Sequence, residues 1–455
     1  MKQLGILMLT LNILISGPNV KAQNKVLTFE EAVKIALENA VLLNTQRNNL
    51  EYSQMQKIAS IAATGPSVSL NSTATRIDGN SFNKNEGVVV NGILDNVSAS
   101  LNANINIFSG FNRINSIRQY AYQLSAQSYF VDRTAQDIMN TVSNQYLNVM
   151  LDVELVKIAK ENFDAQEKQL QQVNEMVNLG ARSSVDGYNQ DALTKGAELK
   201  YVQAEITLDN DKALLAQTLL VDPVQEFDVE RPSWDVNEIG NEVLNIEQLA
   251  DNAKRYRADY LRAVKNEQAQ RFGMLAWKGL MAPQLYAFGN YGTAYNDQHG
   301  LAKTDPDYPR PFINQFKSDN VYKSYGFQLS VPIFNGFFNR VNYVQQKVIY
   351  ENSQVTRRNV EFQIRNDVVR AVKNFEGAKK AFVVTVDQLK AAETALGFEK
   401  ERFNLGITNF VDFTNANRVF VQAETDKAQA EYKLVFQKIL LDYAVGTLKP
   451  EDIEK

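Results

Sequence analysis

Long stretches of the chain repeat apolar residues at the spacing of an α-helix. From Phe111 to Leu179 there is neither glycine nor proline, and apolar side chains recur there at a mean step of about 3.6 residues, the period of a helix with one apolar stripe. The stripe consists of Val131, Ala135, Ile138, Val142, Tyr146, Val149, Val153, Val156, Ala159 and Phe163. This pattern predicts a single helix from Phe111 to Asn178, which is roughly 100 Å long at 1.5 Å per residue.

The faces outside this stripe are rich in Gln, Asn, Thr and Ser. An isolated coiled coil, the alternative interpretation, would carry pairs of opposite charges beside its stripe. Neutral polar side chains instead favour a face that meets water or a lumen.

A short break follows the predicted helix. Gly180 suits the left-handed end of a helix, and the serines after it can cap a returning helix. The same break recurs at Gly406, followed by a threonine. We therefore predict two helical hairpins, whose return helices run to about Leu220 and Val445.

Before each long helix the hydrophobic period changes from about 3.6 to two. From Val97 to Ile107 every odd position is apolar and every even one is Ser or Asn, so one face would meet an apolar environment and the other water. Residues 67–75, 284–295 and 325–331 are its predicted partners. Strands of about ten residues with this alternation are typical of an outer-membrane β-barrel. A soluble hairpin packed on a core is the alternative.

Aromatic residues stand where the predicted strands give way to helices, and an aromatic girdle at the membrane interface is typical of a barrel. They are Phe108, Phe111, Phe334, Phe337 and Phe338. Four strands are too few to close a barrel, since the smallest have eight, and unpaired strand edges are not tolerated in lipid. The barrel must therefore be shared by at least two chains, and a water-filled lumen favours three chains and twelve strands.

The two halves of the chain repeat one another. The run Asn178-Leu179-Gly180, with Val185-Asp186, returns 226 positions later as Asn404-Leu405-Gly406 with Val411-Asp412. Earlier in the halves the shift is 217, so the second half gains about nine residues. We divide the chain into a first repeat at 23–243 and a second at 244–455, each with one strand hairpin and one helical hairpin. The extra residues, with several prolines, predict a longer external loop in the second repeat.

Residues 1–22 have the layout of a secretory signal peptide: Lys2, an apolar run from Leu4 to Ile15, and a small-residue site ending at Ala22. An uncleaved anchor is the alternative, but a dozen apolar residues fall short of the roughly 20 that a spanning helix needs. The chain has no cysteine, which excludes disulfides and a lipid anchor on cysteine.

Charge and side-chain chemistry argue against nucleic-acid binding and catalysis. Without Lys2 and Lys21, 46 basic side chains face 52 acidic ones, not the clustered positive excess of a nucleic-acid-binding surface. The only histidine, His299, is expected in a solvated loop, so zinc and haem sites are not expected. Asp305 and Asp307 predict an acidic turn rather than a calcium site. No nucleotide-binding or serine-hydrolase motif is present, so we expect neither an enzyme nor a cofactor.

The hairpin breaks, the sequence Tyr443-Ala444-Val445-Gly446-Thr447-Leu448 and the strand exits at 107–110 and 332–336 together resemble the TolC family of outer-membrane efflux and secretion channels. The similarity covers nearly all of the predicted mature chain. It implies a homotrimer in the outer-membrane lipid of a Gram-negative bacterium, with a twelve-stranded β-barrel, a periplasmic α-barrel of twelve helices and an equatorial belt near residues 222–244. It also implies an exit duct that works with an inner-membrane RND or ABC transporter and a periplasmic adaptor (membrane fusion) protein.

The resemblance implies two sets of functional residues near the tips of the helical hairpins. The candidates for docking the adaptor are Leu179, Gly180, Ser183, Ser184, Leu405, Gly406 and Thr408. The candidates for a periplasmic gate are Asp186, Asn189, Asp412 and Asn415, because acidic rings at a constriction select cations. Helix capping is the alternative role of the two aspartates, which lie in first helical turns. Asn415 stands where family members can have an acid and Phe403 where they can have a tyrosine, which implies a less charged constriction.

These patterns support one main functional hypothesis and several alternatives. The first is the exit duct of a tripartite efflux pump for small molecules, and the second is the duct of type I protein secretion. A non-channel coiled-coil interaction protein of the cell envelope is an alternative of another class. An enzyme is the weakest hypothesis, since no catalytic set is present.

Overall fold

The computed structural model describes residues 25–83, 87–222, 227–231, 236–239, 244–300, 309–408 and 410–448. The predicted signal peptide and the predicted acidic turn lie outside these residues.

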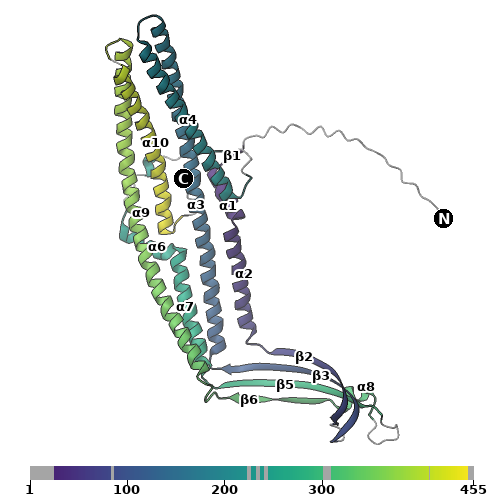
Figure 1. Cartoon of the computed structure of the whole chain (residues 1–455). Helices are drawn as coiled ribbons and strands as arrows, with labels where there is room; N and C mark the ends of the chain where they lie inside the picture. Colours follow the sequence, from purple (N-terminus) through teal and green to yellow (C-terminus); the bar gives the residue numbers. More distant parts are fainter. Residues whose placement is uncertain are drawn as a thin grey trace, which may run out of the picture.

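Two very long helices form the frame of the molecule (Figure 1). Helix α3 (Asn112–Asn178) and helix α9 (Phe338–Asn404) have 67 residues each, and each is followed by a return helix of 36 residues, α4 (Ser184–Leu219) and α10 (Phe410–Val445). The predicted helical hairpins are therefore confirmed, with ends within about one residue of those expected from the sequence.

Shorter helices lie along the half of the frame that is nearer the sheet. They are α1 (Phe29–Asn39), α2 (Val41–Ala62), α6 (Ile246–Tyr256) and α7 (Ala258–Gly279). The other small elements are β1 (Lys25–Leu27), β4 (Phe227–Val229) and α5 (Val236–Ile239), and β1 pairs with β4 in parallel. Tyr146 of α3 ties this small sheet to the frame, because its buried hydroxyl lies 2.7 Å from the carbonyl oxygen of Leu27 and 2.8 Å from that of Glu230.

Four strands form one antiparallel sheet in the order β2-β3-β5-β6. They are β2 (Ser67–Asn83), β3 (Val88–Ser109), β5 (Gln284–Gln298) and β6 (Tyr322–Ser330). All four predicted strands exist, but the first hairpin is longer than predicted, since β2 and β3 stay paired out to Asn83 and Val88. Backbone pairing continues there although the apolar alternation has ended. The segment predicted as an external loop holds α8 (Phe312–Asn314) and a π-helix, η1 (Gln315–Asp319).

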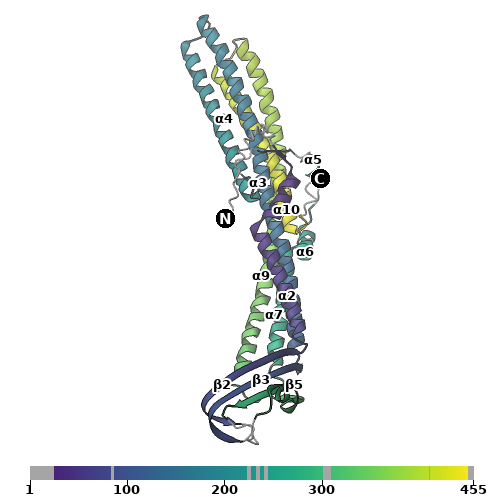
Figure 2. The ribbon, with the colours of Figure 1, turned by 90° about the vertical axis from the view of Figure 1, so that its right-hand side faces the viewer.

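Along the helical part of the chain, four helices lie side by side, and the sheet bends away from their axes at one end (Figures 1 and 2). Nearer the hairpin tips the order is α4-α3-α10-α9, and nearer the sheet it is α2-α3-α7-α9. The sheet continues the same order with β2-β3-β5-β6. One chain is therefore a wall segment, with α2, α4 and β2 along one edge and α9 and β6 along the other.

The apolar core is concentrated where α1 and α6 lie against this wall. One cluster joins α1, α3, α4 and α10 around Phe29 and Tyr146, whose rings meet edge to face at 5.3 Å. The second joins α6, α9 and α10 around Phe375 and Leu434. Elsewhere the wall is one helix thick, which is why neutral polar side chains occupy so much of the helix surface.

The turn from strand to long helix is the same in both repeats. Gly110 and Phe111 both have positive φ (60° and 64°), and so do Gly336 and Phe337 (64° and 61°). Glycine is required at 110, because an added Cβ would lie 2.1 Å from the carbonyl oxygen of Gly279. A left-handed phenylalanine costs roughly 1–2 kcal/mol, so both copies keep an unfavourable backbone to make this turn.

Candidate functional site

The strand register separates the side chains of the sheet into two faces. Leu101 of β3 pairs with Leu70 of β2 and with Tyr291 of β5, and directly paired residues point to the same side of a sheet. One face thus gathers Val68, Leu70, Val97, Ala99, Leu101, Ala103, Tyr291, Tyr295, Tyr325 and Phe327. The other gathers Ser69, Asn71, Thr73, Ser98, Ser100, Asn102, Asn104, Asn290, Asn296 and Ser324. The first face is mainly apolar, although Lys323 lies opposite Tyr291, and the second is mainly hydrophilic, although Phe288 lies opposite Asn104.

The apolar face has the height of a membrane's hydrocarbon layer. It runs along the strands from the Phe108–Leu285 pair to the Val97–Tyr295 pair, roughly 35 Å at about 3.3 Å per residue. At the usual strand tilt of about 45°, this gives a band roughly 25 Å tall, which matches the apolar band of outer-membrane barrels.

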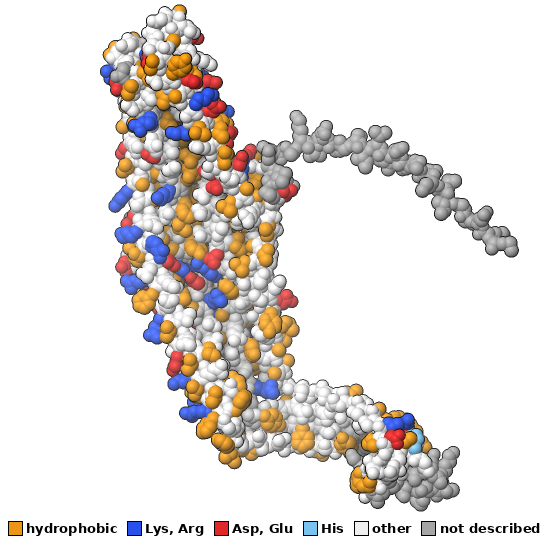
Figure 3. All heavy atoms as spheres, viewed as in Figure 1, with side chains coloured by type: hydrophobic (Ala, Val, Ile, Leu, Met, Phe, Trp, Pro, Cys, Tyr) orange, Lys and Arg blue, Asp and Glu red, His pale blue; other side chains and the backbone are white. Residues whose placement is uncertain are grey.

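Charged side chains gather just beyond this band, at the far end of the sheet (Figure 3). Arg76 of β2 and Asp95 of β3 form a two-pronged pair, with both nitrogen–oxygen distances 2.7 Å. His299, next to the end of β5, is 44% exposed, as expected for a loop histidine, but its Nε2 lies 2.8 Å from Oδ2 of Asp95. The only histidine is therefore part of an ion-pair cluster.

The five aromatic candidates all lie at the opposite end of the sheet and are all exposed in the single chain. Phe108 and Phe111 meet edge to face at 5.4 Å, and Phe334 and Phe337 do the same at 5.6 Å. Phe338 lies against Trp277 of α7 at 6.3 Å. The two repeats thus place equivalent aromatic pairs at one height.

The helical tips close with the same hydrogen bonds in both repeats. In the first, Gly180 has a φ of 73° and donates to the carbonyl oxygen of Val177, while the next amide, from Ala181, donates to Met176. In the second, Gly406 has a φ of 71° and donates to Phe403, and Ile407 donates to Arg402. This is the Schellman end of a helix, which glycine favours because of its positive φ.

The serine and threonine candidates take different positions at the tips. Ser183 is the cap of α4, since its Oγ accepts from the amide of Val185 at 3.1 Å, whereas Ser184 is the first residue of the helix. In the second tip, Thr408 Oγ1 lies 3.3 Å from Oδ2 of Asp412. Leu179 and Leu405 are 83% and 74% exposed, so each tip presents a leucine to its surroundings.

The four gate candidates lie in pairs on the return helices, close to the tips. Asp186 and Asn189 are about one turn apart in α4, and Asp412 and Asn415 are about one turn apart in α10. Both asparagines and Asp412 are exposed, and Asp186 is half-buried. Both aspartates are in the first turn of their helices, so the capping role is compatible with this geometry.

A contact between the two tips was not expected from the sequence. The guanidinium of Arg182, in the first tip, lies 4.2 Å from the ring centroid of Phe403, at the end of α9. Phe403 is 4% exposed and stacks on Phe413 of α10 at 4.9 Å. A cation over an aromatic face is attracted by the ring. Phe403 thus connects the two tips through the face of its ring. A tyrosine at this position could also form a hydrogen bond with its hydroxyl.

Amide side chains join neighbouring helices along the wall. Gln190 of α4 is 1% exposed and donates to Oε1 of Gln166 in α3 at 2.8 Å. Asn417 of α10 donates to Asn162 of α3 at 3.3 Å. The polar residues that the sequence assigns to a wet face therefore also hold the helices together.

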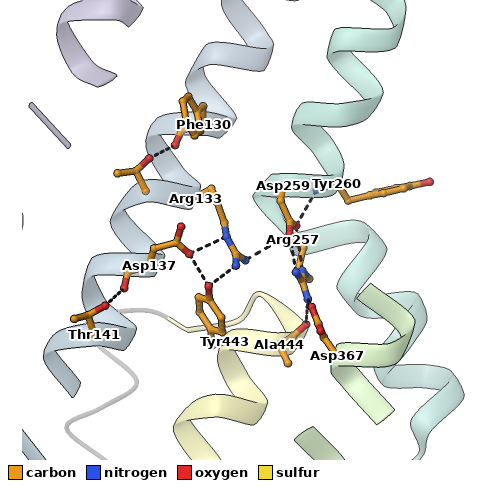
Figure 4. Close-up of polar contacts among 11 residues, drawn as sticks. Phe130, Arg133, Asp137, Thr141, Arg257, Asp259, Tyr260, Asp367, Tyr443 and Ala444 are labelled. Atoms are coloured by element: carbon orange, nitrogen blue, oxygen red, sulfur yellow. Dashed lines mark hydrogen bonds and ion pairs between the residues drawn. The ribbon is translucent and has the colours of Figure 1, made fainter. Parts of the chain in front are cut away.

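The strongest buried charge network lies where the end of α10 meets the start of α7 (Figure 4). Arg257 is 3% exposed, and its guanidinium contacts Asp259 at 2.6 Å, Asp367 of α9 at 3.1 Å and the carbonyl oxygen of Ala444 at 3.3 Å. Gly446 leaves room for this packing, since an added Cβ would lie 2.8 Å from the amide nitrogen of Arg257. Burial opposes ionisation of Asp259, but the hydrogen bonds and charge of Arg257 outweigh it and lower the pKa of Asp259.

A second arginine extends the network to α3. Arg133 pairs with Asp137 at 2.9 Å, and its guanidinium lies 4.5 Å from the ring centroid of Tyr443 in α10. The hydroxyl of Tyr443 donates to Asp137. Burial, together with that carboxylate, raises the pKa of Tyr443 to about 12, so Tyr443 remains a hydrogen-bond donor at neutral pH.

A buried acid lies between the helices of the first hairpin. Asp152 of α3 is 8% exposed, and its Oδ2 has no hydrogen-bond partner. Burial, with the like charge of Asp211 in α4, raises the pKa of Asp152 from 3.8 to about 7. We therefore expect Asp152 to gain or lose its proton near neutral pH.

The described residues contain no group of three or more His, Cys, Asp or Glu side chains that could hold a metal ion. Within the same part of the chain, the helices lack an apolar segment long enough to cross a membrane.

Sequence and structure comparisons agree on what this chain is similar to. A family model described as "Outer membrane efflux protein" matches residues 32–219 and 281–447. Outer membrane protein TolC of Escherichia coli is 22% identical over 382 residues, which cover 80% of this chain and 72% of TolC.

Among solved structures, the outer membrane protein VceC of Vibrio cholerae has a TM-score of 0.78 at 14% identity, covering 92% of this chain and 96% of VceC. The open state of the MtrE outer membrane channel of Neisseria gonorrhoeae has a TM-score of 0.75 at 17% identity, covering 92% and 88%. These similarities show a shared fold.

Proposed function

This chain belongs to the outer membrane efflux protein family, and we propose that it is the trimeric exit duct of a tripartite efflux system. The duct carries small molecules from the periplasm to the exterior without covalent change, while an inner-membrane RND or ABC transporter supplies the energy. The observation that carries the proposal is a two-faced sheet of four strands whose order continues, element by element, into a wall of four helices.

The open edges of the wall segment support a closed ring of copies. In the part of the chain that the structure describes, strands β2 and β6 each have one unpaired edge, and unpaired edges are not tolerated in lipid. Three copies give twelve strands and twelve helical positions at each level. The helical edges also expose apolar side chains that neighbours would cover: Tyr52, Met55, Val202 and Ile206 on one side, and Val344, Val348, Phe362 and Val383 on the other.

The tips support docking of a periplasmic adaptor protein. Leu179, Leu405 and Ile407 are 83%, 74% and 64% exposed around glycine-capped turns. Apolar side chains on fixed turns offer a partner helix a defined surface. Asp186, Asn189, Asp412 and Asn415 would line the narrow end of the duct, where little water screens their charge.

Ion conductance tests the channel proposal. The purified protein, added to a planar lipid bilayer, should form trimers that insert and give discrete conductance steps. A preparation that remains monomeric and forms no pores would contradict the proposal.

Single cysteines test the two faces of the sheet, because the chain has no cysteine of its own. We expect a nitroxide spin label at Tyr291→Cys, on the apolar face, to be accessible to oxygen dissolved in the bilayer. The matched label at Phe288→Cys, on the other face of the same strand, should be accessible to a water-soluble nickel chelate instead. Tyr291 and Phe288 are 47% and 39% exposed in the single chain, so a soluble hairpin would give similar accessibility to the chelate at both.

A further inference from the structure

Residues 309–321, the described part of the segment that leads into β6, pack on the apolar face of the sheet. The ring of Phe312 in α8 lies 5.0 Å from that of Tyr295, and Phe316 of η1 stacks on Phe312 at 4.9 Å. Thr293 Oγ1 donates to the carbonyl oxygen of Phe316 at 2.7 Å. Thr293 and Tyr295 pair with Ala99 and Val97, so the segment covers the last two rows of the apolar band.

Buried amides fix the segment to the edge of β5. Strand β6 pairs with β5 only as far as Gly292. Beyond Gly292, the side chain of Gln315 satisfies the backbone of β5 in place of a paired strand. Its Oε1 accepts from the amide of Asn296 at 3.1 Å, and its Nε2 donates to the carbonyl oxygen of Asn296 at 3.0 Å. Asn320 donates to the carbonyl oxygen of Ala294 at 2.8 Å, and Gln315 is 4% exposed. Hydrogen bonds therefore hold the segment in a fixed position against the edge of the sheet.

The outer surface of this segment is apolar, with basic residues beside it. Phe312 and Ile313 are 45% and 62% exposed, although η1 is held in place by Gln315. Arg310 and Lys317 are also exposed, and Arg310 pairs with Asp319 at 2.9 Å. A fixed turn that keeps aromatic and aliphatic side chains exposed is unfavourable in water, since burial of apolar surface is favourable.

We propose that α8 and η1 form an interfacial anchor that inserts Phe312 and Ile313 into the outer leaflet, at the boundary between acyl chains and phosphate-bearing headgroups. The height of the segment favours a lipid partner: it covers the last rows of the apolar band at Thr293 and Tyr295, and Gln315 reaches Asn296, one residue before the row of Asp95. Amphipathic side chains and flanking basic residues are typical of elements at this depth. The proposal rests on the proposed function, because it needs the apolar face to meet lipid.

A spin label at Ile313→Cys tests the anchor, in trimers reconstituted into vesicles of phosphatidylethanolamine and phosphatidylglycerol. Labels at Tyr291→Cys and Phe288→Cys are the references for lipid and for water. We expect the label at 313 to be more accessible to oxygen than to the nickel chelate, at a depth between the headgroups and the label at 291.

Two results would overturn the anchor while leaving the channel in place. With the label at 291 in lipid, a label at 313 that is fully accessible to the chelate would place the segment in water. A label at 313 inaccessible to both reagents would place it under the neighbouring copy. If the label at 291 is itself in water, the proposed function fails first and the anchor fails with it.

Discussion

At the residue scale, the ends of the two return helices are stabilised by different side chains. The last carbonyl groups of each return helix need donors. In the first repeat Asn39 donates to Leu219 at 3.0 Å, and in the second Arg257 donates to Ala444 at 3.3 Å. Asn39 is neutral, whereas Arg257 is charged and forms ion pairs with two aspartates. Buried charge thus distinguishes the repeats at the same height of the wall.

Removing Arg257 should be far more costly than removing a surface arginine that shares one of its partners. Arg257→Ala leaves Asp259 and Asp367 without their buried cation, and breaking such a pair costs about 3–5 kcal/mol. Thermal unfolding of the detergent-solubilised protein, followed by circular dichroism, measures the loss. Arg370 is 71% exposed and lies 3.4 Å from Asp367, so the control Arg370→Ala should cost at most about 1 kcal/mol. Equal losses in the two variants would contradict the importance of burial.

The stability of the first helical hairpin should depend on pH through Asp152. Its pKa is raised in the folded chain, from 3.8 to about 7, so the folded state binds a proton that the unfolded state has released. Stability is therefore greatest at low pH for this group and falls as the pH rises from about 4 to about 7. Asp152→Asn should remove this dependence and raise the free energy of unfolding by about 1–3 kcal/mol at about pH 8.

Denaturant unfolding at several pH values measures this effect. The control Asp191→Asn changes an exposed acid of α4 and should leave the pH profile as in the unchanged protein. An Asp152→Asn variant with the original pH profile would show that Asp152 does not hold the proton.

At the scale of elements, the tips depend on a backbone geometry that only glycine adopts easily. Gly180 and Gly406 both combine a positive φ with a donated amide. The equivalent helices differ in their neighbours, since Arg182 of the first tip reaches Phe403 of the second. The two hairpins of one chain are therefore coupled at the end that we propose as the docking and gating region.

Replacing a tip glycine by proline should abolish efflux without preventing assembly. In Gly406→Pro the residue can neither reach a φ of 71° nor donate to Phe403, so the tip must refold locally. Drug sensitivity of cells that depend on this channel measures efflux, and the amount of trimer in outer-membrane extracts measures assembly. Gly377→Ala is the control, because nothing lies within 4 Å of its added Cβ. Normal drug resistance with Gly406→Pro would contradict the role of the tip.

At the scale of the whole molecule, one chain is an open wall with two free edges. Among the described residues, nothing pairs with the outer edges of β2 and β6. In the proposed ring of copies, the polar face of the sheet and the amide-rich faces of the helices would become one surface. The proposed transport function therefore requires several copies of the chain.

A detergent-solubilised particle should therefore appear as a threefold tube. Each long helix alone is roughly 100 Å long, so the tube should be at least that long. Electron microscopy of negatively stained particles measures both symmetry and length. Single wall segments, or rings of any other symmetry, would contradict the proposed stoichiometry.

Periodicity along the chain predicted most of the fold. The steps of about 3.6 and of two residues located the long helices and the four strands, because each reflects which faces of an element are apolar. The ends of β2 and β3 were missed, since backbone pairing beyond the apolar band needs no alternation. The division of the chain at residue 243 and the roles of the gate and docking candidates stay predictions.

The sequence by itself determined the helical hairpins, the four long strands, their two-faced character and the family, because these depend on local spacing and on short motifs. Only the tertiary structure decided which polar residues meet. Arg257, Asp367 and Ala444 come from three separate segments, and Arg182 and Phe403 are 221 positions apart. No spacing rule relates such residues, since their contacts depend on how four helices pack into one wall.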